Sequence, residues 1–326
     1  MPKGPDGGLG TRGDRARDGR AIAVVLAAVI GMATGAGACA HAPARFDPSA
    51  RRTCLVLSAG GLKGPAELGA VAAVRESGLH VSCVVGTSVG ALVGGLYASA
   101  PLQDTTERFR RVTRAYADET RREAEARGLG AGVMLAAIAG AISGGWLAPA
   151  GAALGGFVLG AGTTSRADRG RLERVLSVEL AGARVEALPI PFATFHHERS
   201  DHGLALVVDR SGDLAAAVGA SIANPFVFDD VDIANAPAID PGSDRLAATP
   251  VEDACRLFPD SNLLVVNISG NDVFRSADTA AHCPMREVAI SLPPVSPEEM
   301  IEGGATFDAA VRIGHDGVLA ALRRTD

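Results

Sequence analysis

The stretch that decides the fold is TCLVLSAGGLKGPAELGAVAAVRESGLHVSCVVGTSVGALVGGLYAS, residues 53–99. Two short apolar runs in it, 53–58 and 81–86, each break off into glycines and predict buried β-strands. The segments that follow them, 64–78 and 88–99, carry apolar residues at helical spacing. Two strand–helix units in fewer than 50 residues predict a parallel sheet with right-handed crossover connections.

The rest of the sequence continues this alternation. It predicts an α/β domain over 51–326, with three α/β/α layers around a mainly parallel central sheet. Further helices are expected at 105–128, 167–182, 213–223, 249–258 and 305–324, and further strands at 191–197, 204–209, 262–269 and 286–292. The strands 191–197 and 204–209 are expected to form a hairpin across ERSDHG.

An apolar insertion at 129–163 interrupts this domain, and no charged residue occurs from Gly128 to Ser165. Its two halves flank Trp146 and Pro149, and each half is shorter than the roughly 20 residues that span a bilayer easily. Several glycines in it have the small-xxx-small spacing that lets helices approach closely. Three interpretations stay open: a buried hairpin, a lid that dips into lipid beside the active site, or a double membrane span.

The composition of the chain indicates which classes of partner it can bind. The chain has 326 residues, of which 47% are hydrophobic, and a formal net charge of −6. The negative charge disfavours nucleic acid as a partner. The apolar content is sufficient for a large core and leaves apolar surface for another contact.

The N-terminal segment, 1–50, has the pattern of a secretory signal followed by a linker. A polar head with several arginines precedes an uncharged apolar run from Ala21 to Ala33. The following Ala36-Gly37-Ala38-Cys39 resembles a bacterial lipobox, which makes Cys39 the lipidation candidate. Ordinary signal cleavage and an uncleaved anchor are the alternatives. We therefore expect an exported protein of the bacterial cell envelope, with a membrane-anchored lipoprotein as the leading form.

Gly86-Thr87-Ser88-Val89-Gly90 is a G-x-S-x-G sequence between a predicted strand and a predicted helix. That context indicates a nucleophile elbow, with Gly86 and Gly90 flanking the serine. A sharp strand-to-helix turn brings neighbouring backbones together and leaves no room for Cβ atoms. Ser88 would lie at a helix N-terminus, where partial positive charge favours an alkoxide-like transition state.

A second glycine-rich turn, Gly60-Gly61-Leu62-Lys63-Gly64, also follows a strand and opens a helix. Its bare backbone N–H groups predict an anion cradle. In acyl transfer such a cradle is an oxyanion hole, worth about 2.7–4 kcal/mol per donor. A phosphate loop is disfavoured, because neither G-x-x-x-x-G-K-[ST] nor G-x-G-x-x-G occurs here. Together the two turns predict a serine hydrolase.

The pair SAGGLKG and GTSVGAL resembles the patatin-like phospholipase family, with its G-G-x-[RK]-G oxyanion turn and G-x-S-x-G serine. The segment ASIANPFVFDDVDIANAPAID, residues 220–240, is similar to the family segment that leads into an aspartate base. The resemblance covers roughly 53–325 apart from the insertion. It implies a Ser88–Asp240 dyad that cleaves acyl esters of phospholipids or lysophospholipids at a membrane surface. It implies no metal and no organic cofactor.

The sequence departs from the family pattern at three positions. Ala59 stands where the family commonly has glycine, Lys63 replaces the commoner arginine, and Asp240-Pro241-Gly242 replaces D-G-G. Pro241 fixes φ and removes an N–H, so the backbone here can differ from that of the family and displace Asp240. Asp244 is the alternative base in that case. Pro241 also favours an alternative function, a catalytically weak envelope lipid-binding protein. A peptidase or thioesterase on the same dyad is a further alternative.

A Ser-Asp-His triad is the alternative for the catalytic machinery. Ser88, Asp240 and His315 run in the chain order of an α/β-hydrolase. His315, however, lies within a helical pattern, and the first glycine turn favours the dyad. A free aspartate has a pKa of about 3.9, so a dyad needs close hydrogen bonding in a dry site. We therefore expect an enclosed apolar pocket, which suits acyl chains.

The remaining candidate residues are histidines, which could bind a metal, and cysteines, which could form disulfides. HHERSDH, residues 196–202, is expected to be a solvated hairpin loop rather than a metal site. Cys54 and Cys83 lie in apolar strand-like runs and are expected to be core thiols. Cys255 and Cys283 can pair in an exported protein, although the sequence does not decide it.

Overall fold

The computed structural model describes residues 45–47, 49, 52–126, 169–200, 203–224 and 238–324. Cys39 and the apolar insertion at 129–163 lie outside the described residues, and so do residues 225–237. In the part of the chain that is described, no helix combines the length and the apolar character needed to cross a bilayer.

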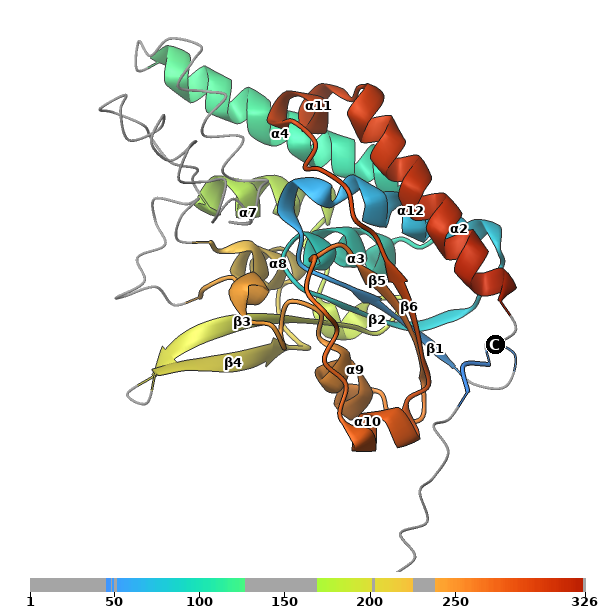
Figure 1. The fold of residues 1–326 in the computed structure, drawn as a ribbon. Coiled ribbons are helices and arrows are strands. Elements are labelled where there is room, and N and C mark those ends of the chain that lie inside the picture. Colours follow the sequence, from blue (N-terminus) through green and yellow to red (C-terminus); the bar gives the residue numbers. More distant parts are fainter. Residues whose placement is uncertain are drawn as a thin grey trace, which may run out of the picture. The chain divides into compact units, whose positions relative to one another are not determined.

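A six-stranded sheet in the order β4-β3-β2-β1-β5-β6 forms the centre of the domain (Figure 1). Its strands are β1 Thr53–Leu57, β2 Val81–Gly86, β3 Phe192–Ser200, β4 Gly203–Asp209, β5 Asn262–Asn267 and β6 Met285–Ala289. Every neighbouring pair is parallel except β3 and β4. The chain moves from β1 to β2 and β3 on one side, then returns to β5 on the other. The carboxyl end of β1 is therefore a switch point, where open α/β sheets bind their ligands.

Helices cover both faces of this sheet, which confirms the predicted three layers (Figure 1). One face carries α2 Pro65–Glu76, α3 Val89–Ser99, α8 Leu214–Ile222 and α12 Ala305–Arg323, with α4 Thr105–Ala126, α7 Arg169–Glu179 and α11 Pro297–Glu302 outside them. The other face carries α9 Val251–Leu257 and α10 Ala277–His282. Alternate residues of β1 serve the two cores: Leu55 and Leu57 face the α2 side, and Val56 faces the α9 side.

Two helices in the structure have no counterpart in the sequence prediction. Both α10 and α11 begin after a serine that caps them: Ser276 Oγ accepts from Thr279 N, and Ser296 Oγ accepts from Glu299 N. Helix α7 ends before the predicted residue 182, because Ala181 at φ 50° and Gly182 at φ 68° adopt the left-handed conformation that terminates helices. Short 3-10 turns occur at η2 Gly61–Lys63, η3 Val185–Ala187 and η4 Pro241–Ser243.

Strand β3 is longer than predicted and extends beyond the end of its neighbour β2. The last pair between them is Gly86 with Thr194, whereas β3 continues to Ser200 alongside β4. Beyond that pair, the open edge of β3 binds Ile239 through His197. The extension therefore gives the chain before Asp240 a strand to pair with.

The structure corrects the prediction for Cys54 and Cys83. Both are buried as expected, but they form a disulfide instead of remaining thiols. The reason is register, since Cys54 and Cys83 are direct partners across β1 and β2 with 4.5 Å between their Cα atoms. Cys255 and Cys283 also form a disulfide, with an S–S distance of 2.08 Å.

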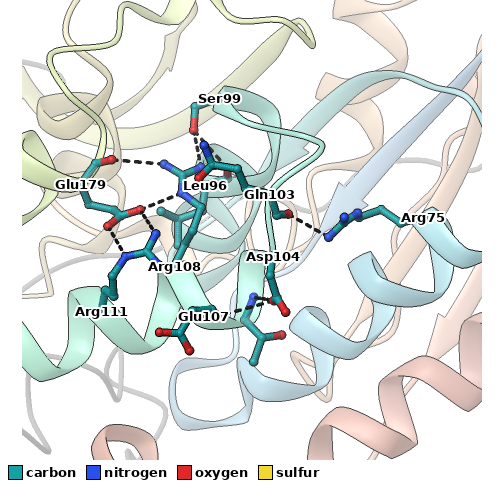
Figure 2. A network of polar contacts seen from close by, with 10 residues as sticks. Arg75, Leu96, Ser99, Gln103, Asp104, Glu107, Arg108, Arg111 and Glu179 are labelled. Carbon is teal, nitrogen blue, oxygen red and sulfur yellow. Dashed lines mark hydrogen bonds and ion pairs between the residues drawn. The ribbon is translucent and has the colours of Figure 1, made fainter.

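A partly buried ion-pair network fixes α3, α4 and α7 to one another (Figure 2). Arg108 on α4 donates to Glu179 Oε1 at 2.7 Å, to Ser99 Oγ at 3.0 Å and to the carbonyl of Leu96. Arg111 binds both oxygens of the same Glu179 carboxylate. Burial raises the pKa of Glu179, but the hydrogen bonds from Arg111 and Arg108 outweigh it and lower the pKa overall. The two helices that flank the apolar insertion are thus held together.

Candidate active site

Ser88 lies in a sharp turn between the end of β2 and the start of α3. Ser88 has a φ of 56°, a strained value for a residue other than glycine. A Cβ on Gly86 would lie 2.3 Å from the carbonyl oxygen of Gly90, and one on Gly90 would lie 2.6 Å from the carbonyl oxygen of Leu57. The two glycines are therefore required by close backbone approach, as the sequence predicted.

Asp240 lies directly against Ser88. The Ser88 hydroxyl donates to Asp240 Oδ2 at 2.8 Å, and both side chains are buried, at 1% and 3% exposure. Asp240 is the N-cap of η4, and its other oxygen, Oδ1, accepts from Gly242 N at 2.8 Å. Pro241 occupies the first position of η4, where proline fits a helical turn. Pro241 therefore does not displace Asp240 from the serine.

The carboxyl end of α8 holds both members of this pair. Ser88 N donates to Ser221 Oγ at 3.0 Å, and Asp240 N donates to the carbonyl of Ala223 at 2.7 Å. These residues belong to the ASIA sequence at 220–223. Sequence reasoning assigned no role to Ser221. The available signal was a hydroxyl in an otherwise apolar helix just before the aspartate segment.

Burial sets the electrostatics of Asp240. It raises the pKa of this carboxyl from 3.8 to about 7, although hydrogen bonds from Ser88 and Gly242 act in the opposite direction. The ionised form is therefore available near neutral pH and is a stronger base than an exposed aspartate. The burial of Asp240 thus agrees with the expectation that a Ser–Asp pair needs a site that excludes water.

The first glycine turn lies next to both residues. A Cβ on Gly64 would lie 2.4 Å from Val89 Cγ2, and one on Gly242 would lie 3.0 Å from the Ala59 Cβ. The turn is thus packed between the residue after Ser88 and the residues after Asp240. The turn therefore adjoins the chain on either side of the Ser88–Asp240 pair.

The five predicted residues of this turn do not all offer a free donor. The amides of Lys63 and Gly64 are used inside the turn, on the carbonyls of Gly60 and Gly61. The amides of Gly60, Gly61 and Leu62 donate to no protein acceptor among the residues that the structure describes. The Lys63 ammonium donates to the carbonyl of Ile268 at 3.2 Å and fixes the turn to the end of β5.

This arrangement of serine elbow, aspartate and glycine turn agrees with a match to a known family. A sequence profile described as Patatin-like phospholipase matches residues 55–254, more than half of the chain. The chain belongs to the patatin-like phospholipase family. The match includes the elbow, the glycine turn and Asp240, and thereby all the residues of this site.

Individual patatin-like relatives match a shorter region. Patatin-like phospholipase domain-containing protein ZK370.4 of Caenorhabditis elegans is 53% identical over 47 residues, which are 14% of this chain and 4% of that protein. Lysophospholipase NTE1 of Mycosarcoma maydis is 48% identical over 63 residues, which are 18% of this chain and 3% of that protein. The matched region thus spans only a small part of these curated relatives. The crystal structure of VipD from Legionella pneumophila aligns with a TM-score of 0.36 and 14% identity, covering 83% of this chain and 66% of that chain.

The alternative site residues of this patatin-like chain lie elsewhere. His315 is on α12, where its imidazole bonds to Glu76 at 2.7 Å and to Asp316 at 3.1 Å. The Asp240 carboxylate instead bonds to Ser88 and Gly242, so the structure does not assemble the triad. Asp244, the fallback base, accepts from Leu246 N and lies 3.5 Å from His197.

The prediction that HHERSDH forms a solvated loop is wrong for its two leading histidines. His196 and His197 lie within β3, in the part of the strand that was predicted over 191–197, and both are largely buried. His196 bonds to Asp209 at 2.6 Å and to Glu198 at 3.1 Å. Burial lowers the pKa of His196, but these two carboxylates outweigh it and raise the pKa overall. His197 faces the opposite side of the strand, and burial lowers its pKa.

Proposed function

We propose that this patatin-like chain hydrolyses carboxylic esters of lipids, with Ser88 as nucleophile and Asp240 as general base. The observation that carries the proposal is the 2.8 Å hydrogen bond from Ser88 Oγ to Asp240 Oδ2 at a strained, buried elbow. Strain at such a serine is typical of a functional position. The neighbouring turn with unused amides supports the same chemistry.

The proposed reaction has two halves. Ser88 Oγ attacks the acyl carbonyl carbon while its proton passes to Asp240, and the negative carbonyl oxygen binds the amides of the Gly60–Leu62 turn. The tetrahedral intermediate collapses, and the alcohol leaves with the proton from Asp240. Water then attacks the acyl group on Ser88 with Asp240 again as base, which releases the fatty acid and restores the serine. A carboxyl pKa of about 7 suits both proton transfers at neutral pH.

The substrate class follows from the family and the burial of the site. We infer that the substrate is a phospholipid or lysophospholipid. The name Patatin-like phospholipase and the matching segment of Lysophospholipase NTE1 of Mycosarcoma maydis support this class. We also infer that the chain acts at a membrane surface and is exported to a bacterial cell envelope with Cys39 lipidated, on the sequence pattern of 1–50.

The test compares wild type with Ser88→Ala and His315→Ala on p-nitrophenyl esters of increasing acyl length, followed by phospholipid and lysophospholipid vesicles. We expect Ser88→Ala to abolish hydrolysis and His315→Ala to retain it, because His315 bonds to Glu76 and Asp316. Activity confined to short esters would place the chain among general esterases. A wild type no more active than Ser88→Ala on every substrate would indicate a lipid-binding protein without catalysis.

A further inference from the structure

The turn that carries Asp240 is bound at both of its ends by one residue outside it, His197. At the upstream end, His197 N donates to the carbonyl of Ile239 and Ile239 N donates to the carbonyl of His197, both at 2.8 Å. At the downstream end, His197 Nε2 lies 3.5 Å from Asp244 Oδ2. The four-residue span between these contacts begins with Asp240 and includes the whole of η4.

The position of His197 makes these contacts possible. Strand β3 has passed the end of β2 at this point, so its backbone edge is free to pair with Ile239. The His197 side chain is 12% exposed, on the face opposite His196. One residue thus uses its backbone and its imidazole on the same short turn.

Asp244 passes this restraint on to the rest of the site. Its Oδ1 accepts from Leu246 N at 2.9 Å, and its carbonyl accepts from Ala248 N at 2.7 Å, which fixes the loop that follows. That loop is bound to both glycine turns: Thr87 Oγ1 donates to the carbonyl of Ala247, and Ala59 N donates to the carbonyl of Ala248, each at 2.7 Å. The loop therefore connects the histidine to residues adjoining the serine and the oxyanion turn.

We propose that His197 is a positioning residue that aligns the Asp240 carboxylate with Ser88 by holding the Ile239–Asp244 turn. It does not touch the reacting atoms, and it acts through Ile239 and Asp244. The inference rests on the proposed function for its kinetic consequence, while the restraint itself is a property of the fold. A misplacement of about 1 Å costs up to roughly 100-fold in rate, so a residue that fixes this turn contributes directly to turnover.

The neighbouring His196 supplies a matched control. It is the same residue type on the same strand and is similarly buried, but it bonds to Asp209 and Glu198 instead of the Asp240 turn. A general loss of β3 stability would affect both positions. Only a positioning role predicts a difference in turnover per folded molecule.

The experiment measures kcat and KM on a short p-nitrophenyl ester for His197→Ala, His197→Gln and His196→Gln, each corrected for its folded fraction. We expect His197→Ala to lose about 10–100-fold in kcat with KM changed less than about twofold. His197→Gln should recover most of the loss, because its amide nitrogen can replace Nε2 as a donor to Asp244. His196→Gln should keep wild-type kcat per folded molecule. Equal losses at the two histidines, or an unchanged kcat in His197→Ala, would overturn the proposal.

Two further measurements test the link between His197 and the Ile239–Asp244 turn directly. Asp244→Asn combined with His197→Ala should cost no more than the larger single effect, since both remove one interaction; additive losses contradict the link. Amide hydrogen exchange across 238–248 should rise in His197→Ala compared with wild type, whether or not any ester is hydrolysed. Unchanged exchange rejects the restraint by the His197 side chain even if the enzyme is active, because the backbone hydrogen bonds to Ile239 remain in His197→Ala. If the wild type shows no turnover that depends on Ser88, the proposed function is rejected. The hydrogen-exchange measurement then still tests whether the His197 side chain restrains the turn.

Discussion

Replacing Asp240 by asparagine should stabilise the protein while removing its activity. An asparagine side chain cannot be ionised, so the variant avoids placing a negative charge in a site where the native side chain is 3% exposed. The geometry of the site allows the exchange. The amide oxygen still accepts from Gly242 N, and the amide NH2 can donate to Ser88 Oγ.

The magnitude follows from the pKa of the carboxyl. Burial raises it from 3.8 in an exposed aspartate to about 7. Between these values the native state holds a proton that the unfolded state has released, so the free energy of unfolding of the wild type falls as pH rises through this window. The full difference corresponds to about 4 kcal/mol, of which about 3 kcal/mol lies between pH 5 and pH 8.

Urea unfolding of wild type and Asp240→Asn at several pH values tests this prediction. The stability of the variant relative to wild type should increase by about 3 kcal/mol from pH 5 to pH 8. Asp278→Asn, at a carboxylate that is 90% exposed, is the matched control for the same exchange on the surface. Hydrolysis should fall by about 10²–10⁴-fold in Asp240→Asn, the typical contribution of a general base. Parallel stability curves for wild type and Asp240→Asn would mean that Asp240 ionises as an exposed aspartate does, and the burial argument would be refuted.

One substitution, one mass measurement and one deletion have definite expected results. Gly86→Ala should destabilise the fold by about 3 kcal/mol or more in urea unfolding, because its Cβ would lie 2.3 Å from the carbonyl oxygen of Gly90; a smaller effect would mean that the elbow can relax. Mass spectrometry of the mature N-terminus should find Cys39 lipidated, and an unmodified start at His41 would indicate simple secretion. Deletion of 129–162 should leave short-ester hydrolysis intact and reduce vesicle binding together with long-chain hydrolysis, whereas unchanged vesicle binding would exclude a lipid-facing role.

The parts of the fold that depend on local chemistry were predictable from the sequence. The strand–glycine–helix pattern of 53–99 sets β1, β2 and the two turns, because backbone crowding at Gly86 and Gly90 is a short-range effect. Asp240 is different, since nothing in Asp240-Pro241-Gly242 itself separates it from Asp244. Only the resemblance of the preceding segment indicated it.

The features that sequence reasoning missed depend on long-range pairing. β3 continues through a polar sequence because β4 pairs with it as far as Ser200 and Ile239 pairs with it at His197. The Cys54–Cys83 disulfide depends on the register between two strands, which hydrophobicity does not specify. The capping serines of α10 and α11 were the exception, since a serine followed by helix-forming residues is a readable start signal.

The hydrogen bond between Ser88 and Asp240 joins residues 152 positions apart in the chain. Closing so long a loop carries an entropic cost, which must be offset by the contacts among α3, β3 and α8, which lie between the two residues in the chain. A nascent chain that has folded only its first strands has the serine and the glycine turn but no base. Hydrolytic activity should therefore arise late in folding, after the segment containing Asp240 has docked. If the chain is a lipid hydrolase that crosses a membrane unfolded, as proposed above, this order of folding would protect that membrane during passage.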